Sequence, residues 1–196
     1  MIVTDISDTL NYPYCIEGPA NCDNTTRSTD TLHLSTILYD IRDTLSPRSE
    51  MPEEDLDWYA GGGWLWERVY DRAHQDAINR GLLIRPGEFE RDGIVGSPDG
   101  LDLENSRLVE LKCRWASSRK FDSLEKNFYY ELLQIKSYLA MTGFTEAELT
   151  IFFVCGDWQP PIPCVRSALL EFTKYEIETS WGSVVKHAKN RRMLYD

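Results

Sequence analysis

The stretch from residue 96 to residue 112 holds two acids and a lysine at spacings that could support hydrolysis. Asp99 follows a Gly-Ser-Pro turn, and Glu-Leu-Lys occupies positions 110–112 in the second of two expected neighbouring strands. Strand side chains alternate faces, so Glu110 and Lys112 share one face, roughly 7 Å apart, two strand steps of ~3.3 Å. Asp99 reaches the same point if the two strands pair. Two carboxylates and an amine there can hold a hard divalent cation and activate a water for phosphodiester hydrolysis.

The opposite face of the second strand is apolar, with Val109, Leu111, Cys113 and Trp115. One face can therefore pack in a core while the other carries the charged groups. The alternative is an exposed strand with ordinary surface charges, because short acid-x-Lys strings are common. Spacing alone leaves both interpretations open.

Length and composition indicate one globular unit. The chain has 196 residues, 42% of them hydrophobic, which suffices for a sizeable core. No apolar run approaches 18 residues, and the first residues lack the basic start and apolar run of a signal peptide. We therefore expect a cytoplasmic protein with no membrane partner. The five cysteines are odd in number and form no Cys-x-x-Cys, so reduced thiols are expected.

The net charge of −11 is unusual for a protein that binds nucleic acid, but the acids are unevenly distributed. Residues 1–60 hold 12 acids and 3 bases, whereas residues 61–196 hold 20 acids and 18 bases. We expect residues 1–60 to form an acidic N-terminal segment, partly irregular with a helix, and residues 61–196 to form the rest of a single globular domain. A local basic path is compatible with this distribution, and a uniformly basic surface is excluded.

Apolar periodicity predicts four helices and several strands. The expected helices cover about residues 35–45, 64–79, 127–141 and 176–193. The expected strands cover residues 89–103, 108–115, 149–155 and 164–175. Residues 1–28, 47–57 and 116–126 are expected to be irregular or loops. This order of elements predicts an α/β protein with a central mixed β-sheet flanked by helices.

Four motifs together resemble a known family. Pro98-Asp99 and Glu110-Leu111-Lys112 resemble the two halves of the PD-(D/E)XK nuclease signature. Gln134-Ile-Lys-Ser-Tyr138 is similar to the Gln-x-x-x-Tyr of its RecB-like branch, and Gly63-Trp-Leu-Trp-Glu67 resembles the acid that this branch carries on an early helix. The phage exonucleases of the lambda and YqaJ kind are relatives in that branch. The resemblance covers roughly residues 63–155 and implies a restriction-endonuclease-like core within a nuclease domain at 61–196.

The resemblance implies a set of catalytic and metal-binding residues. Asp99, Glu110 and the backbone carbonyl of Leu111 would bind Mg²⁺ or Mn²⁺, since oxygen ligands suit these cations. Glu67 would complete the metal shell directly or through water. Lys112 would lie beside the attacking water and stabilise developing charge.

The helix that follows the signature contributes two further residues. Gln134 would orient a ligand, the water or a phosphate, and Tyr138 would contact DNA or support the site. His74, on the same helix face as Glu67, is a candidate metal ligand, although a lone histidine is more often structural.

Further DNA contacts are proposed with an alternative for each. Ser35 resembles a DNA-contacting serine of the family, but a helix cap explains it equally well. Arg114, Arg119 and Lys120 would bind phosphates after the catalytic strand, or belong to a solvated loop. The aromatic residues near the triple glycine would stack on bases or pack in the core.

The leading functional hypothesis is a metal-dependent DNA exonuclease that acts on DNA ends in phage or bacterial recombination or repair. A structure- or sequence-specific endonuclease on the same fold is the second hypothesis. The third is a non-catalytic DNA-binding or assembly subunit. The acidic N-terminal segment leaves room for a recombinase or annealing-protein partner, or for homo-oligomers.

Overall fold

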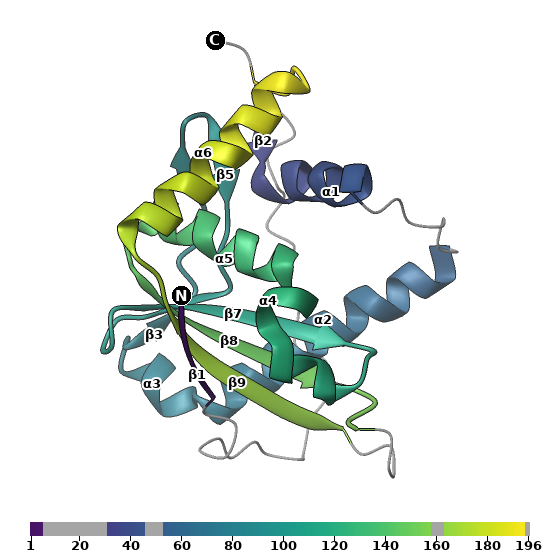
Figure 1. Cartoon of the computed structure of the whole chain (residues 1–196). Coiled ribbons are helices and arrows are strands. Elements are labelled where there is room, and N and C mark those ends of the chain that lie inside the picture. Colours follow the sequence, from purple (N-terminus) through teal and green to yellow (C-terminus); the bar gives the residue numbers. More distant parts are fainter. Residues whose placement is uncertain (6–30, 46–52, 158–162, 195–196) are drawn as a thin grey trace.

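A computed structural model describes residues 1–5, 31–45, 53–157 and 163–194, and for residues 53–60 it describes the backbone alone. Its centre is a six-stranded mixed sheet with the order β1-β9-β8-β7-β6-β3 (Figure 1). The strands are β1 (Ile2–Asp5), β3 (Leu83–Ile84), β6 (Gly100–Asp102), β7 (Arg107–Arg114), β8 (Glu146–Phe153) and β9 (Cys164–Glu171). Only β7 and β8 run parallel among these neighbours, so the expected mixed sheet is confirmed.

Helices lie on both faces of this sheet. They are α1 (Leu34–Leu45), α2 (Glu53–Ala73), α3 (Gln75–Asn79), α4 (Leu124–Asn127), α5 (Tyr129–Thr142) and α6 (Lys174–Asn190). Helices α1, α5 and α6 pack together over one face, where the larger apolar core lies. On the other face, Trp66 and Tyr70 of α2 pack against Val109 and Leu111 of β7. Strand β7 is therefore buried between two layers of helix.

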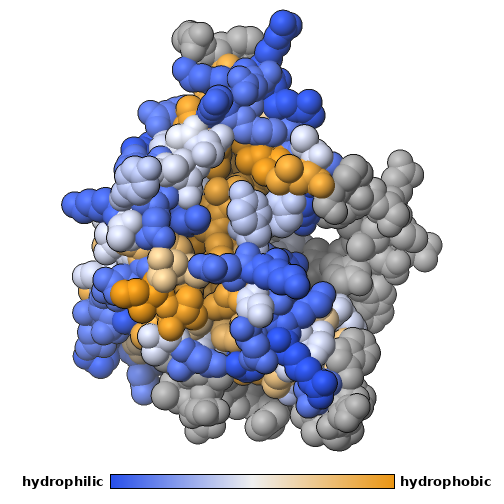
Figure 2. Space-filling view, viewed as in Figure 1, coloured by the Kyte–Doolittle hydropathy of each residue, from blue (hydrophilic) through white to orange (hydrophobic). Residues whose placement is uncertain are grey.

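The α5 stripe predicted from the sequence is the centre of the larger core. Phe128, Leu132, Ile135 and Leu139 are all buried, and Gly143 ends the helix with a positive φ of 82°. A left-handed residue at this position is a common helix stop, and glycine adopts it without steric cost. Figure 2 shows hydrophilic side chains over most of the face seen in Figure 1, with hydrophobic ones gathered in its middle.

The prediction of a single strand over residues 89–103 is wrong, because the chain turns twice within this range and forms three short strands. Strands β4 (Phe89–Arg91) and β5 (Ile94–Gly96) form a hairpin through Asp92 and Gly93, both with positive φ. An Asp-Gly pair favours this tight turn. The hairpin pairs with β2 (Leu32–His33) in a small three-stranded sheet, and the chain reaches β6 only after a break at residues 97–99.

Three expected loops are partly regular in the structure. Ile2–Asp5 pairs antiparallel with β9, which corrects the irregular start within the described residues. Helix α2 begins at Glu53 inside the expected acidic loop and runs through the triple glycine, because packing of Trp66 and Tyr70 outweighs the low helix propensity of glycine. Residues 118–127 form a 3₁₀ turn, η2 (Ser118–Ser123), and α4, since Phe121 and Leu124 are buried in the core.

The remaining differences concern element ends. The helix expected over residues 64–79 is interrupted at His74, and Gly81 closes α3 as predicted: Leu82 donates to the Ala77 carbonyl and Gly81 to that of Ile78. Strand β9 ends at Glu171 because Thr173 and Glu176 form a capping box at the start of α6. Among the described residues, no helix is long and apolar enough to cross a membrane.

Candidate active site

The pairing of β6 with β7 brings the two halves of the motif together. Gly100 lies opposite Val109 in the antiparallel register, so Asp99, one residue before β6, lies beside Glu110. The Asp99 carboxylate accepts a hydrogen bond from the Leu111 backbone nitrogen at 2.7 Å. The expectation that Asp99 reaches Glu110 and Lys112 through strand pairing is therefore confirmed in its geometry.

Glu110 and Lys112 lie on the α5 side of β7 and form an ion pair. The Glu110 side chain is fully buried and that of Lys112 is 21% exposed, so the interpretation as an exposed charged strand is wrong. Burial, together with the nearby negative charge of Asp99, raises the pKa of Glu110 to about 8. Burial alone would lower the pKa of Lys112, but the carboxylates of Glu110 and Asp99 outweigh it and raise that pKa.

Helix α5 contributes the next two residues. Gln134 donates a hydrogen bond of 3.1 Å to the Tyr138 hydroxyl, and Tyr138 is only 5% exposed. Burial, followed by the negative charge of Glu110, raises the pKa of Tyr138. The ring of Tyr138 packs so closely on β5 that a Cβ at Gly96 would lie 2.8 Å from it. This glycine therefore allows β5 to approach α5 beside the acids.

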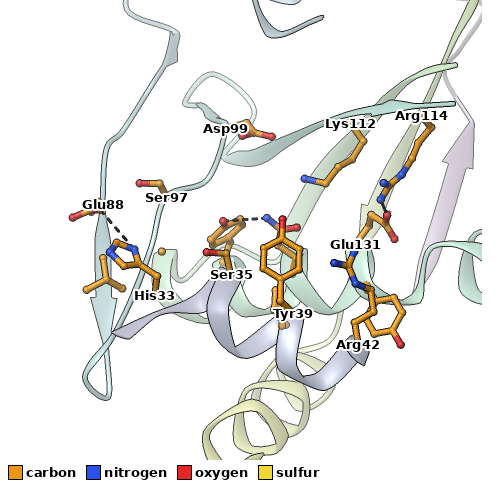
Figure 3. A pocket seen from close by; sticks show the side chains of 16 residues that line it. His33, Ser35, Tyr39, Arg42, Glu88, Ser97, Asp99, Lys112, Arg114 and Glu131 are labelled. Carbon is orange, nitrogen blue, oxygen red and sulfur yellow. Dashed lines mark hydrogen bonds and ion pairs between the residues drawn. The ribbon is translucent and has the colours of Figure 1, made fainter. Parts of the chain in front are cut away.

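A cleft of about 340 Å³ is lined by Asp99, Lys112, Gln134 and Tyr138, whereas Glu110 is fully buried. Asp99, Lys112 and Arg114 point into it from the strands, and Ser35, Tyr39 and Arg42 face them from α1 (Figure 3). The α1 residues are spaced by four and three positions, so they share one helix face. Helix α1 begins at Leu34, so Ser35 lies within its first turn and its side chain lines the cleft.

At one end of the cleft Arg114 forms an ion pair with Glu131, which is nearly buried. Burial, and then the positive charge of nearby Arg42, lowers the pKa of Arg114. Neither Glu131 nor Arg42 follows from the family motif. The spacing of Glu131, Gln134 and Tyr138 on one face of α5 is the sequence signal that could have identified Glu131.

Glu67 of α2 lies on the other side of Asp99, next to a residue that sequence reasoning missed. This residue is Arg85, which follows β3 and lies 3.6 Å from the Glu67 carboxylate. Burial, together with the charge of Asp99, raises the pKa of Glu67. No motif signals Arg85, because its position depends on the pairing of β3 with β6.

Several candidates lie apart from this centre. Arg119 and Lys120 lie in η2, outside the cleft lining, and Arg119 lies 3.8 Å from Asp157. His74 stacks on Tyr70 with ring centroids 4.1 Å apart and does not line the cleft. Trp66 packs in the smaller core, as expected for part of the aromatic group, whereas the side chains of Trp58 and Tyr59 lie outside the described residues.

The donor set at Asp99 and Glu110 fits a divalent cation. The Oε2 atom of Glu110 is buried without a hydrogen-bond partner, an arrangement that costs free energy unless a cation satisfies it. Carboxylate oxygens are the ligands that Mg²⁺ and Mn²⁺ prefer. Within the described part of the chain, no three His, Cys, Asp or Glu side chains converge as a metal cage. The arrangement therefore supplies two carboxylates and would need water or backbone oxygen for the remaining ligands.

The α/β architecture, with its six-stranded mixed sheet, is similar to that of two solved exonuclease structures. A phage-related exonuclease from Haemophilus somnus 129PT matches with a TM-score of 0.53 at 15% identity, over 80% of this chain and 79% of that chain. An alkaline exonuclease from Laribacter hongkongensis matches with a TM-score of 0.50 at 17% identity, over 82% of this chain and 89% of that chain. No family model and no curated protein matches the chain. The predicted resemblance is confirmed as a likeness of fold.

Proposed function

We propose that this protein is a metal-dependent deoxyribonuclease, and specifically a DNA exonuclease. The observation that carries the proposal is that Asp99 and Lys112 line one cleft, while Glu110, which is paired with Lys112, keeps a buried carboxylate oxygen without a partner. A purely structural pair would gain nothing from an unsatisfied buried oxygen. The exonuclease fold of the two solved structures supports the same activity.

Mg²⁺ or Mn²⁺ would be held by Asp99, Glu110 and the backbone carbonyl of Leu111. When bound, the ion supplies positive charge to the phosphate and makes a water molecule more acidic. The Asp99–Leu111 hydrogen bond orients the Asp99 carboxylate before any ligand arrives. Lys112, which lines the cleft, orients the attacking water and stabilises negative charge on the phosphate.

The other cleft residues bind and orient the substrate. Gln134 lines the cleft and orients a phosphate or the water, while Tyr138 holds the Gln134 amide. Ser35 and Arg114 contact the DNA backbone, and Arg114 is held in place by Glu131. A guanidinium forms paired hydrogen bonds with phosphate oxygens, which suits this role. Arg119 and Lys120 would bind backbone further from the cleavage point.

The test compares an end-labelled linear duplex with a covalently closed circle. Both substrates are incubated with Mg²⁺, Mn²⁺ or chelator, using wild type, Lys112→Ala and the control Lys174→Ala. Lys174 is exposed on α6 and far from the motif in sequence. The proposal expects metal-dependent loss of linear DNA alone, retained in Lys174→Ala and reduced at least about a hundredfold in Lys112→Ala.

The other outcomes separate the alternatives. Cutting of both substrates would replace the exonuclease with an endonuclease that uses the same residues. Full activity in Lys112→Ala would exclude the assigned site. No cutting with either metal, together with retained DNA binding, would overturn the enzyme and favour a binding subunit.

A further inference from the structure

Arg85 connects three acidic positions beside the candidate active site. Its Nη1 donates to the Asp99 backbone carbonyl and lies 3.6 Å from Glu67 Oε2. Its Nη2 donates to Asp71 Oδ1 at 2.9 Å. One guanidinium thus contacts the residue that begins the motif and both acids on this face of α2.

This arrangement differs from an ordinary surface ion pair. An isolated exposed pair is weak, because water competes for both groups and two long side chains must be immobilised. Arg85 instead makes two ionic contacts and one backbone hydrogen bond, and its side chain is 38% exposed. The planar guanidinium presents several donors in a fixed geometry. It therefore places a positive charge between these acids.

We infer that Arg85 takes the place of a second divalent cation, so that this active site holds one metal ion. The inference rests on the proposed function, in which Asp99 and Glu110 bind the first ion. Glu67 is the acid available to hold a second ion near Asp99, and its carboxylate already faces Arg85. A second divalent cation bound to Glu67 would lie next to the positively charged Arg85 guanidinium, and the two positive charges would repel each other.

The inference revises the sequence-based expectation for Glu67. In this arrangement Glu67 and Asp71 neutralise and orient Arg85 and do not ligate a metal. Arg85 in turn holds the Asp99 carbonyl, and therefore positions the peptide that presents the Asp99 carboxylate. Arg85 is thus a positioning residue for Asp99, and its charge stabilises negative charge on the substrate from the Glu67 side.

The test counts bound Mn²⁺ per chain by titration, with the free ion followed by electron paramagnetic resonance. Wild type is expected to bind one ion. Arg85→Gln is expected to bind two ions, with an affinity for the second at least about tenfold above any residual affinity of wild type for a second ion, because Glu67 and Asp71 are released. Arg80→Gln is the matched control, since Arg80 is exposed at the end of α3, and it should bind one ion like wild type.

Glu67→Gln provides a second measurement should Arg85→Gln fold poorly. As a single substitution, Glu67→Gln should still bind one Mn²⁺ ion per chain, with an affinity for that ion changed less than about threefold. In the Arg85→Gln background it should abolish the second ion. Circular dichroism and thermal unfolding verify that each variant is folded.

Two results would overturn the inference. The first is two ions in wild type with one lost in Glu67→Gln, which leaves the proposed nuclease function standing. The second is a single ion in folded Arg85→Gln. If no ion binds wild type, and Lys112→Ala digests DNA as wild type does, the proposed function fails as well.

Discussion

The Asp99 carboxylate accepts a hydrogen bond from the Leu111 backbone nitrogen at 2.7 Å and so joins the two halves of the motif. Asp99 precedes β6, whereas Leu111 lies in β7, between the acid and the lysine. The bond occurs one residue before the regular pairing of β6 with β7 begins at Gly100. The Asp99 side chain thus accepts the Leu111 N–H in place of a backbone carbonyl, directly beside the candidate active site.

This bond predicts different effects for two substitutions of Asp99. Asp99→Asn keeps an amide oxygen that can accept the Leu111 N–H, so stability should change little, while activity should fall at least about a hundredfold through loss of the charge. Asp99→Ala should lose the same activity and also about 1–3 kcal/mol of stability, because the N–H loses its partner. Thermal unfolding and a nuclease assay measure the two effects. Equal stability of both variants would contradict the structural role of the bond.

Metal binding should stabilise the protein through Glu110. At an ion concentration one hundred times Kd, Mn²⁺ should add about 2.7 kcal/mol, or roughly 5–10 °C in Tm for a chain of this length. Chelator should reverse the increase, and Glu110→Gln should abolish it because it removes the carboxylate proposed to bind the ion. Glu171→Gln, an exposed change on β9, is the control and should respond like wild type. An equal increase in Glu110→Gln would place the ion elsewhere.

The close contact between Gly96 and Tyr138 predicts a destabilising effect of one methyl group. In Gly96→Ala the new Cβ would lie 2.8 Å from Tyr138 Cε1 and 3.1 Å from Met141 Sδ. Overpacking should cost about 1–3 kcal/mol in urea unfolding. Movement of Tyr138 should also lower kcat roughly tenfold to a hundredfold.

A glycine in open surroundings provides the control for this substitution. Gly182 lies on the exposed side of α6, and a Cβ there meets nothing within 4 Å. Gly182→Ala should therefore stabilise the protein by roughly 0.5–1 kcal/mol through helix propensity. Destabilisation of similar size in both variants would exclude the specific contact with Tyr138.

The contact between α1 and α6 should weaken in acid. Arg191 and His187 hold the pKa of Asp40 down to about 2, below its ordinary value of 3.8, with Asp40 oxygens 2.8 Å and 2.6 Å from these residues. A lowered folded-state pKa contributes stability above the ordinary pKa and loses it as the pH falls through the folded value. The stability difference between wild type and Asp40→Asn should therefore be largest near neutral pH.

Urea unfolding at a series of pH values measures this difference. It should fade between about pH 4 and pH 2, where Asp40 becomes protonated and resembles asparagine. A difference that stays constant down to pH 2.5 would show that the ionised carboxylate contributes nothing. Because α1 carries Ser35 and Tyr39 into the cleft, the same titration also tests how firmly that wall is held.

Much of β7 could be predicted from the sequence, because the alternation of its side chains is a local property. The alternation of side chains on β7 places Glu110 and Lys112 on one face whatever surrounds them. The apolar spacing of α5 likewise determines that Leu132, Ile135 and Leu139 face the core and leaves Gln134 beside them. The helix ends at Gly81 and Gly143 could also be predicted, because glycine readily adopts the positive φ that stops a helix.

Only the tertiary structure decided how deeply the site is buried and what surrounds it. Glu110 is fully buried where α5 packs on β7. The β4–β5 hairpin, which contacts α5, was not predicted because the pattern of its two short strands resembles that of one long strand. Arg85 reaches Asp99 through the pairing of β3 with β6, a contact between positions 14 residues apart that no periodicity encodes. Side-chain alternation is a property of the backbone and can be read from the sequence. Long-range pairing depends on which surfaces fit together, and this is known only once the chain has folded.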